Sequence, residues 1–210
     1  MIKPRIILVG AGGHASSCID VIEQHSQYEI AGLVGTPCEL NNETLGYPVI
    51  GTEAQLPALS KTYSWALIAI GQINNPDNRI RLFHLIEELG FRAPTIGSPS
   101  AYVSPHAKIG PGTVVMHGAT VNARATIGRN CILNSHSLIE HDAVVGNDCH
   151  IATRATINGD VSVGSGSFIG SGAVVRNKVK IGERCLIGMG RSLRHDLDDG
   201  TNYTSQKAKQ

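Results

Sequence analysis

The sequence has almost no excess of charge of either sign. Its 210 residues include 18 lysines and arginines against 17 aspartates and glutamates, so the formal charge is +1 at pH 7. Proteins that bind nucleic acids or anionic membranes usually carry a cluster of basic side chains. The balance therefore argues against nucleic-acid and membrane partners and favours small, near-neutral ones.

Long hydrophobic runs and paired cysteines are also missing. The apolar stretch 6–9 ends in glycines and is too short for a secretory signal or a membrane span. The five cysteines are an odd number with no CxxC pair, and they match neither a disulfide framework nor a zinc-site spacing. We therefore expect a cytoplasmic protein with reduced thiols and no metal.

The sequence does contain a strict repeat. Every sixth residue is aliphatic, at Val103, Ile109, Val115, Val121, Ile127, Leu133, Ile139, Val145, Ile151, Ile157, Val163, Ile169, Val175, Ile181, Ile187 and Leu193. A small residue usually stands two positions earlier and a glycine often one position later. This period fits neither a helix nor a meander, but it fits a short strand followed by a corner, where glycine tolerates the backbone angles. Three such faces close one coil, so residues 97–195 are predicted to form a parallel β-helix of about five coils.

Residues 1–96 follow a different pattern, which predicts a small Rossmann-like α/β domain. Buried strands over 6–9, 28–35 and 64–71 alternate with helices near 15–24 and 76–89. Gly10, Gly12 and Gly13 open the first helix, where free backbone N–H groups suit a phosphate. The motif GAGGHA lacks the last glycine of the dinucleotide fingerprint, and the second strand ends in GLVGTP with no acidic residue in the place where the fingerprint needs one. A nucleotide is expected there rather than an intact NAD site, and the alternative for His14 is a packing or capping role.

Three histidines lie close together in the stretch NSHSLIEHDAVVGNDCHI, residues 134–151. His141 is predicted at a corner, and its neighbours one coil away, Ala123 and Gly159, are small enough to leave space around the ring. His150 points outward from its strand and His136 lies on another corner, so the three rings do not converge into a metal site. The alternative for His141 is a solvated corner with no chemical role.

The repeat resembles the left-handed β-helix of the hexapeptide-repeat acyltransferases, which mostly assemble as trimers with active sites between subunits. The motifs GAGGHA, AIG after the third strand and HDAVVGNDCHI narrow the resemblance over residues 6–193. They are similar to the branch of sialic-acid O-acetyltransferases and bacterial UDP-4-amino-sugar N-acetyltransferases. In that branch the N-terminal domain binds a nucleotide-linked sugar and the coil binds acetyl-CoA. The match weakens in the C-terminal tail, residues 196–210.

The resemblance also implies residue roles. His141 would be the general base, and Asp142 would raise its basicity if the chain turns enough to bring the two together; otherwise Glu140 competes for that role. His150 would contact the acetyl thioester and help to hold its carbonyl. Acetyl-CoA would also contact Gly159, Ser171 and Met189. The nucleotide-linked sugar would contact Gly12, Gly13, His14, Gly35, Thr36 and Gly71.

The sequence thus predicts an acetyl-CoA-dependent acetyltransferase. The expected reaction is N-acetylation of a nucleotide-linked 4-amino-6-deoxy sugar, with UDP favoured over GDP, by direct attack of the amine on the thioester in a homotrimer. One alternative is O-acetylation of a sialic-acid-like sugar. Others, from different classes, are a non-catalytic hexapeptide-repeat scaffold and a nicotinamide oxidoreductase fused to a trimerising coil.

Overall fold

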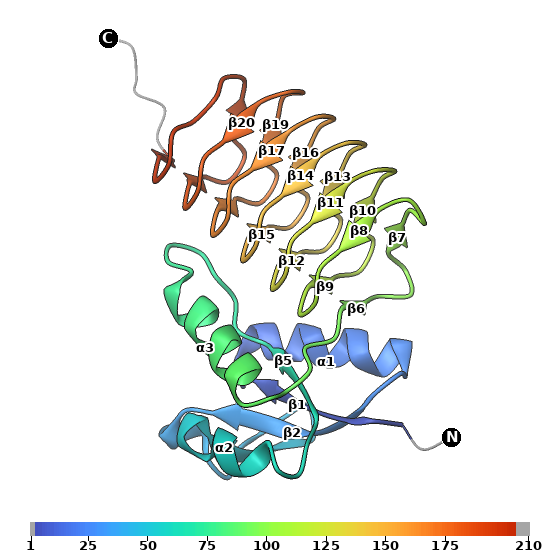
Figure 1. Cartoon of the computed structure of the whole chain (residues 1–210), viewed down its shortest axis with the longest axis vertical. Coiled ribbons are helices and arrows are strands. Elements are labelled where there is room, and N and C mark those ends of the chain that lie inside the picture. The colour runs from blue at the N-terminus through green and yellow to red at the C-terminus, as the bar shows by residue number, and fades with distance from the viewer. Residues whose placement is uncertain (1–2, 205–210) are drawn as a thin grey trace.

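The computed structural model describes residues 3–204 and places an α/β domain against one face of a β-helix (Figure 1). The domain has one sheet in the order β3-β4-β2-β1-β5, and only the β3–β4 pair is antiparallel. Its strands are β1 Arg5–Val9, β2 Glu29–Gly35, β3 Glu43–Thr44, β4 Tyr47–Thr52 and β5 Trp65–Ile68. Its helices are α1 Gly13–His25, α2 Leu56–Leu59 and α3 Asp77–Glu88, with short 3-10 turns η1 Pro37–Glu39 and η2 Glu53–Gln55.

The three strands and two helices expected from the sequence are present, together with a strand that was not predicted, β4. This strand pairs in parallel with β2 and extends the sheet beyond it. Its sequence, YPVIGT, contains a proline and a glycine, residues that are depleted in strands. The proline is tolerated because Pro48 is the second residue of the strand and its neighbour β3 is only two residues long.

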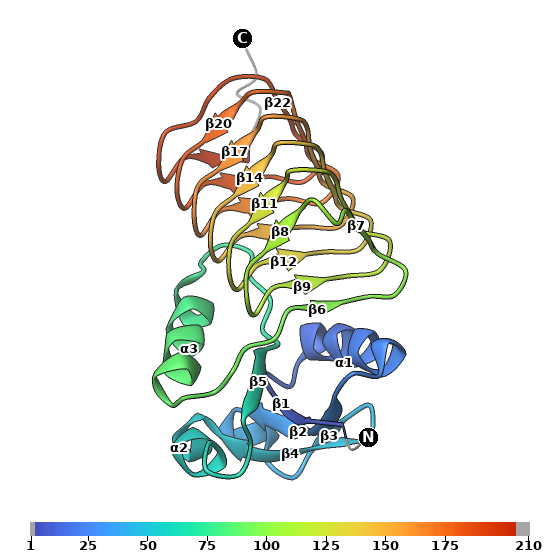
Figure 2. The same ribbon diagram turned by 45° about the vertical axis from the view of Figure 1, so that its right-hand side comes forward.

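The β-helix consists of short strands arranged in three parallel sheets, and Figure 2 shows the triangular outline of its coils. The first sheet, which we call the covered sheet, contains β6 Ile96–Gly97, β9 Val114–Val115, β12 Ile132–Leu133, β15 His150–Ile151, β18 Phe168–Ile169, β21 Leu186–Ile187 and β23 Asn202–Tyr203. The second contains β7 Tyr102–Val103, β10 Thr120–Val121, β13 Leu138–Ile139, β16 Thr156–Ile157, β19 Val174–Val175 and β22 Ser192–Leu193. The third contains β8 Lys108–Ile109, β11 Thr126–Ile127, β14 Val144–Val145, β17 Ser162–Val163 and β20 Lys180–Ile181.

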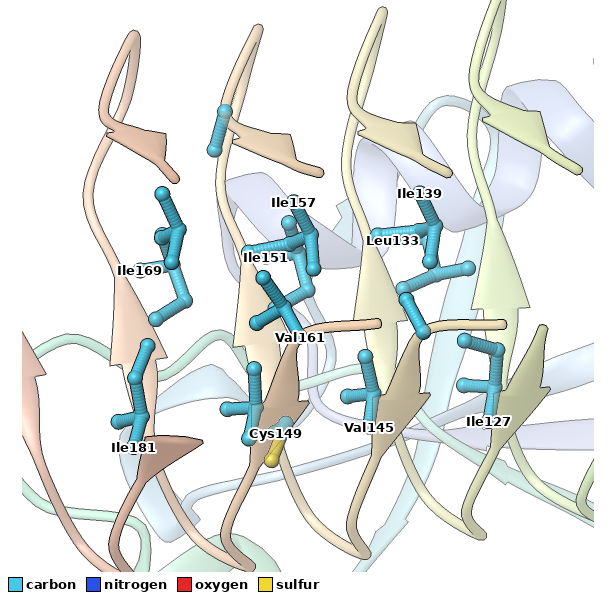
Figure 3. Close-up of a cluster of buried hydrophobic side chains, with 14 of the residues drawn as sticks. Ile127, Leu133, Ile139, Val145, Cys149, Ile151, Ile157, Val161, Ile169 and Ile181 are labelled. Atoms are coloured by element: carbon cyan, nitrogen blue, oxygen red, sulfur yellow. The ribbon is translucent and has the colours of Figure 1, made fainter. Parts of the chain in front are cut away.

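The repeat positions fill the interior of the prism as the sequence predicts. Figure 3 shows Ile139, Val145 and Ile151, from three successive strands, projecting into the same core. The small residues two positions before the aliphatic ones are also inside: Ala143, for example, is completely buried. An aliphatic and a small side chain per face therefore fill a coil too narrow for two large ones.

The glycine that follows each aliphatic residue was predicted to tolerate the backbone angles of the corner, but the structure gives it a different role. Positive φ angles recur every six residues from Gly112 to Gly190, and they fall three residues after each aliphatic position, not one. The glycine directly after the aliphatic residue is required by close stacking instead. A Cβ at Gly128 would lie 2.7 Å from the Gly146 carbonyl carbon of the next coil, and one at Gly110 would lie 2.7 Å from that of Gly128. Successive coils therefore touch through their backbones along this column.

Part of the predicted C-terminal tail belongs to the β-helix. Within residues 196–204, β23 pairs in parallel with β21, and Leu197 bridges to Ile181. The backbone of this segment therefore continues the β-helix, and the predicted boundary at residue 196 stays an interpretation. Residues 205–210 lie outside the described part of the chain.

The α/β domain and the β-helix share a core. Helix α1 and the sheet below it pack with Ile96, Val114 and Met116 of the β-helix. Polar pairs flank this core: Asp20 with His117 at 2.8 Å, Glu87 with Arg129 at 3.0 Å and Asp77 with Arg184 at 2.6 Å. The predicted division at residue 96 stays an interpretation, because the two parts are joined by one continuous apolar contact.

Candidate functional site

His141 lies on the corner between the second and third sheets. This corner, residues 104–107, 122–125, 140–143, 158–161 and 176–179, is opposite the covered sheet and is called the far corner below. The imidazole is about half exposed, with 54 % of its side-chain surface accessible. A catalytic base must reach its substrate, and this ring is accessible enough to do so.

Asp142, and not Glu140, holds the ring. Its Oδ2 lies 2.8 Å from His141 Nδ1, while Glu140 bonds to the Asn122 side chain at 2.9 Å and to the His141 backbone N–H at 3.3 Å. The condition set by the sequence is met, because Asp142 has a φ of 61° and the chain is turning there. A carboxylate can only accept from Nδ1, so the proton lies on Nδ1 and Nε2 of the neutral ring keeps its lone pair.

Arg124, which the sequence analysis did not consider, also binds Asp142. Its Nε lies 2.5 Å from Oδ1 and its Nη2 lies 2.7 Å from Oδ2. The hydrogen bonds from Arg124 first, and from His141 second, hold the pKa of Asp142 well below its usual range. Asp142 is therefore ionised throughout the neutral pH range.

Gly159 lies beside His141, as the period of 18 residues predicts. A Cβ at that position would lie 2.8 Å from His141 Cε1 and 2.9 Å from Nε2, so the ring itself occupies the room that glycine leaves. Because real Cβ atoms do not approach so closely, any larger residue at 159 would displace the imidazole.

The predicted sugar-nucleotide residues come together at a cavity of about 400 Å³ in the α/β domain. It lies at the carboxyl ends of β1, β2 and β5, where ligands bind in open α/β sheets. All six predicted positions line it: Gly12, Gly13, His14, Gly35, Thr36 and Gly71. Gly10, with a φ of 127°, is needed because a Cβ there would lie 2.7 Å from the Ala69 carbonyl oxygen.

Two acidic residues in this cavity escaped the sequence analysis. Glu39 accepts bonds of 2.7 Å from both the backbone N–H and the hydroxyl of Thr36, and these bonds lower its pKa. Glu53 also lines the cavity and pairs with Arg81. The spacing of Thr36 and Glu39 is that of a capping box, a signal that could have placed a carboxylate just after the second strand.

A buried polar network links the α/β domain to the covered sheet. Arg79 is 2 % exposed and donates to the Gln72 side chain at 3.2 Å and to Asn130 at 3.1 Å. Asn130 in turn donates to Asp148 at 2.7 Å. The backbone carbonyl of Gln72 lies 2.6 Å from His150 Nδ1. The network joins residues far apart in sequence, which single-sequence reasoning does not pair.

His14 and His150 are both neutral in this setting. Burial lowers the pKa of each to about 4, with Arg79 contributing to both shifts and His150 to that of His14. His150 points outward from its strand as predicted, but it is buried under the α/β domain and packs edge-on against Phe168. His14 Nε2 is buried and has no hydrogen-bond partner among the described residues.

The hydrogen bonds of His150 fix its tautomer, while its contact with the acetyl thioester stays a prediction. A carbonyl can only accept, so the bond to Gln72 places the proton on Nδ1. Nε2 is then an acceptor and lies 3.3 Å from the side-chain nitrogen of Asn134. Asn134, which was not predicted from the sequence, therefore donates its amide N–H to His150 Nε2.

The remaining predicted acetyl-CoA positions, Ser171 and Met189, are both exposed on the outer surface of the coil. Met189 is 78 % exposed. Neither lies in the described cavity, and their role stays a prediction.

Within residues 3–204 no group of three histidine, cysteine, aspartate or glutamate side chains is placed to hold a metal ion. All five cysteines are free, and Cys131 and Cys149 are buried inside the coil. None of the helices in this part of the chain has the length and apolar character needed to cross a bilayer.

Comparisons with known proteins agree with this architecture. The PglD N-terminal domain matches residues 5–86, and the bacterial transferase hexapeptide matches four overlapping stretches, residues 106–141, 124–159, 142–177 and 160–190. A variant of perosamine N-acetyltransferase from Caulobacter crescentus, in complex with CoA and GDP-perosamine, is 32% identical, with 95% of this chain and 92% of that chain covered and a TM-score of 0.87. The acetyltransferase domain of PglB from Neisseria gonorrhoeae, in complex with acetyl coenzyme A, is 30% identical, with 95% of both chains covered and a TM-score of 0.86.

WeeI from Acinetobacter baumannii, at 21% identity, has the same fold, with a TM-score of 0.66 over 90% of this chain and 94% of that chain. A search among curated proteins found no match. The predicted fold class, a Rossmann-like domain followed by a left-handed parallel β-helix, is confirmed by these similarities. The chain belongs to the hexapeptide-repeat acetyltransferases that carry a PglD-type N-terminal domain.

Proposed function

We propose that this protein transfers the acetyl group of acetyl-CoA to the amino group of a nucleotide-linked 4-amino-6-deoxy sugar. The observation that carries the proposal is the imidazole of His141, accessible on the far corner and fixed by Asp142 with Nε2 free to accept a proton. The cavity beside α1 supplies the second requirement, a site for the nucleotide. The relatives described above, with CoA and GDP-perosamine or acetyl coenzyme A, support the pairing of these two ligands.

The proposed reaction needs one base and no covalent enzyme intermediate. The neutral amine attacks the thioester carbonyl, and His141 Nε2 accepts the proton that the nitrogen loses. The tetrahedral intermediate collapses with cleavage of the C–S bond. The CoA thiolate then takes the proton from the imidazolium, which returns His141 to its neutral form. Asp142 keeps the ring in the tautomer that this step requires.

The separation of the nucleotide cavity from His141 supports catalysis between subunits, and the resemblance implies that these form a homotrimer. The α/β domain, with its cavity, rests on the covered sheet, whereas His141 lies on the corner opposite that sheet. A sugar bound in the cavity of one chain therefore cannot meet the base of the same chain without crossing the prism. We infer that the base of one subunit acts on the sugar held by another, as the resemblance implies.

The nucleotide is a finer part of the proposal. The resemblance to UDP-4-amino-sugar N-acetyltransferases favours UDP, while a structurally similar protein is in complex with GDP-perosamine. Reduced cysteines favour the cytoplasm, which stays a prediction.

The test is an acetyl-transfer assay with UDP- and GDP-linked 4-amino-6-deoxy sugars, following release of the CoA thiol. We expect transfer by the native protein and a loss of about 10²- to 10⁴-fold in kcat for His141→Asn, because a general base contributes that much. His106→Asn, on the same corner two coils before, is the matched control and should keep full activity. Equal rates for the native protein and His141→Asn would refute the assignment of His141 as the general base. Acetylation of hydroxyl acceptors alone would show that the reaction is O-acetylation.

A further inference from the structure

Arg124 and Asp142 are placed together by the repeat itself. They are 18 residues apart, so they occupy the same position of the far corner in successive coils. Both have left-handed backbone angles, with φ of 64° and 61°, and their side chains therefore leave the corner in the same way. The guanidinium meets the carboxylate through two hydrogen bonds, of 2.5 and 2.7 Å. This fork geometry is specific to arginine, since lysine is a point charge.

The fork fixes the carboxylate that orients the base. Asp142 Oδ2 accepts from both Arg124 Nη2 and His141 Nδ1, at 2.7 and 2.8 Å. With Oδ1 also bound, the carboxylate cannot rotate about its terminal bond without breaking bonds to Arg124. The direction in which it presents Oδ2 to the imidazole is thereby set by a residue that does not touch His141.

The fork also changes the charge that the imidazole meets. An isolated carboxylate at 2.8 Å would add one negative charge beside Nδ1, but the guanidinium of Arg124 offsets it. Asp142 therefore acts on His141 mainly by orientation, which differs from the raised basicity that the resemblance implies. A base that is not held by net negative charge releases its proton to the departing thiolate more readily.

Other charged groups on the far corner are accounted for. Glu140 precedes His141 and is engaged by Asn122, and Asp160 stands on the next coil, where its backbone N–H donates to the His141 carbonyl. Arg176 and Lys178 lie two coils after the histidine, and both are exposed. Only Arg124 pairs directly, within the described residues, with the carboxylate that binds the imidazole.

We propose that Arg124 is a positioning residue of the acetyl transfer: it holds the Asp142 carboxylate toward His141 and neutralises that carboxylate's charge. The inference rests on the proposed function, because it assigns Arg124 a part in the work of the same base.

The test compares Arg124→Gln, which loses charge and fork, with Arg124→Lys, which keeps the charge alone. For Arg124→Gln we expect a roughly tenfold lower kcat and an acid limb of kcat/KM moved to higher pH by about half a unit to one unit, because the unshielded carboxylate then stabilises the imidazolium. For Arg124→Lys the acid limb should return to its native position while kcat recovers only in part. In an Asp142→Asn background, Arg124→Gln should have no further effect.

The matched control is Arg184→Gln. Arg184 also has a left-handed backbone, with a φ of 53°, and pairs with an exposed aspartate, Asp77, at 2.6 Å, but on a different corner. It should leave the acid limb unchanged. Additive effects of Arg124→Gln and Asp142→Asn, or an acid limb that Arg124→Gln does not move, would overturn the proposal.

A second readout does not depend on the substrate. The carbon-bound protons of the histidine rings can be followed by NMR, with the His141 signal assigned from its absence in His141→Asn. The titration midpoint of that signal should be higher in Arg124→Gln than in the native protein and restored in Arg124→Lys. If the native protein transfers no acetyl group but the midpoint moves, the proposed function fails and the positioning stands. An unmoved midpoint in an active enzyme overturns the positioning alone.

Discussion

The β-helix and the α/β domain hold their functional side chains on different kinds of frame. On the far corner, the surroundings of His141 are built from neighbouring turns of one repeat. Asp142 and Gly159 contact the ring, and Arg124 binds Asp142. In the α/β domain, the cavity is assembled from the ends of three separate strands, and His14 depends on packing against another domain. The β-helix holds its functional residues through contacts between neighbouring turns, whereas the α/β domain depends on contacts between segments that are far apart in the sequence.

Substitutions in the two regions should therefore affect different properties of the protein. A substitution on the far corner should alter the chemistry with little effect on folding, because the corner is exposed and its contacts are local. A substitution between the domains should alter stability, because buried polar groups there lose their partners.

The largest effect is expected from Arg79→Met. Arg79 is buried between the domains, and its removal leaves the side-chain oxygens of Gln72 and Asn130 without the bonds they accept from the guanidinium, and the buried Asp148 without its nearby cation. Breaking a buried charge network usually costs about 3–5 kcal/mol. Urea unfolding, followed by the single tryptophan, Trp65, and by circular dichroism, should show the α/β domain losing structure before the coil. Arg5→Met, at an exposed position, is the control, and equal midpoints for both variants would contradict the prediction.

Acid should destabilise the same interface. His14 and His150 have a pKa of about 4 when folded, below their ordinary value of 6.5, so the unfolded chain binds more protons between those two pH values. The free energy of unfolding is therefore unaffected by these two histidines above pH 6.5 and falls as the pH drops toward 4, by about 3 kcal/mol for each histidine. Urea unfolding at a series of pH values measures this slope.

Replacing His14 by Gln should remove about one proton from that slope, whereas His106→Gln, at an exposed corner, should leave it unchanged. Stability that stays constant between pH 7 and pH 5 would show that the two rings are not buried as neutral groups.

The sequence could predict contacts within the β-helix, but not the contacts between the two domains. The period of 18 residues is enough by itself to place Gly159 and Ala123 beside His141, and it could equally have paired Arg124 with Asp142. The contact of His150 with Gln72 spans 78 residues and that of Arg79 with Asn130 spans 51. These pairs depend on how two domains pack, which no local pattern encodes. For the same reason, the burial of His150 and its tautomer could not be read from its outward place on a strand.

A smaller effect, confined to the chemistry, is expected from Gly159→Ala. Its Cβ would lie 2.8 Å from His141 Cε1, so the imidazole must move away from its place on the corner. Misplacing a catalytic group commonly reduces kcat by tenfold to a hundredfold. The melting temperature should change little, because the ring can swing outward into solvent. Gly97→Ala, where the added Cβ meets nothing within 4 Å, is the matched control. A native kcat for Gly159→Ala would show that the position of the ring is not critical.

The smallest effect concerns two ion pairs of the same form, one in each domain. Arg81 binds Glu53 through bonds of 2.5 and 2.8 Å, much as Arg124 binds Asp142, and solvent reaches both pairs, although Asp142 is the least exposed of the four side chains. Solvent screens such pairs, so Arg81→Gln should lower the free energy of unfolding by less than about 1 kcal/mol. Arg124→Gln should have a similarly small effect on the melting temperature. Only one of the two carboxylates touches an imidazole, and so only Arg124→Gln should move the acid limb of kcat/KM for acetyl transfer. If Arg81→Gln moved that limb as far, the shift would reflect the loss of any surface charge, and the contrast between a structural pair and a pair that serves the base would disappear.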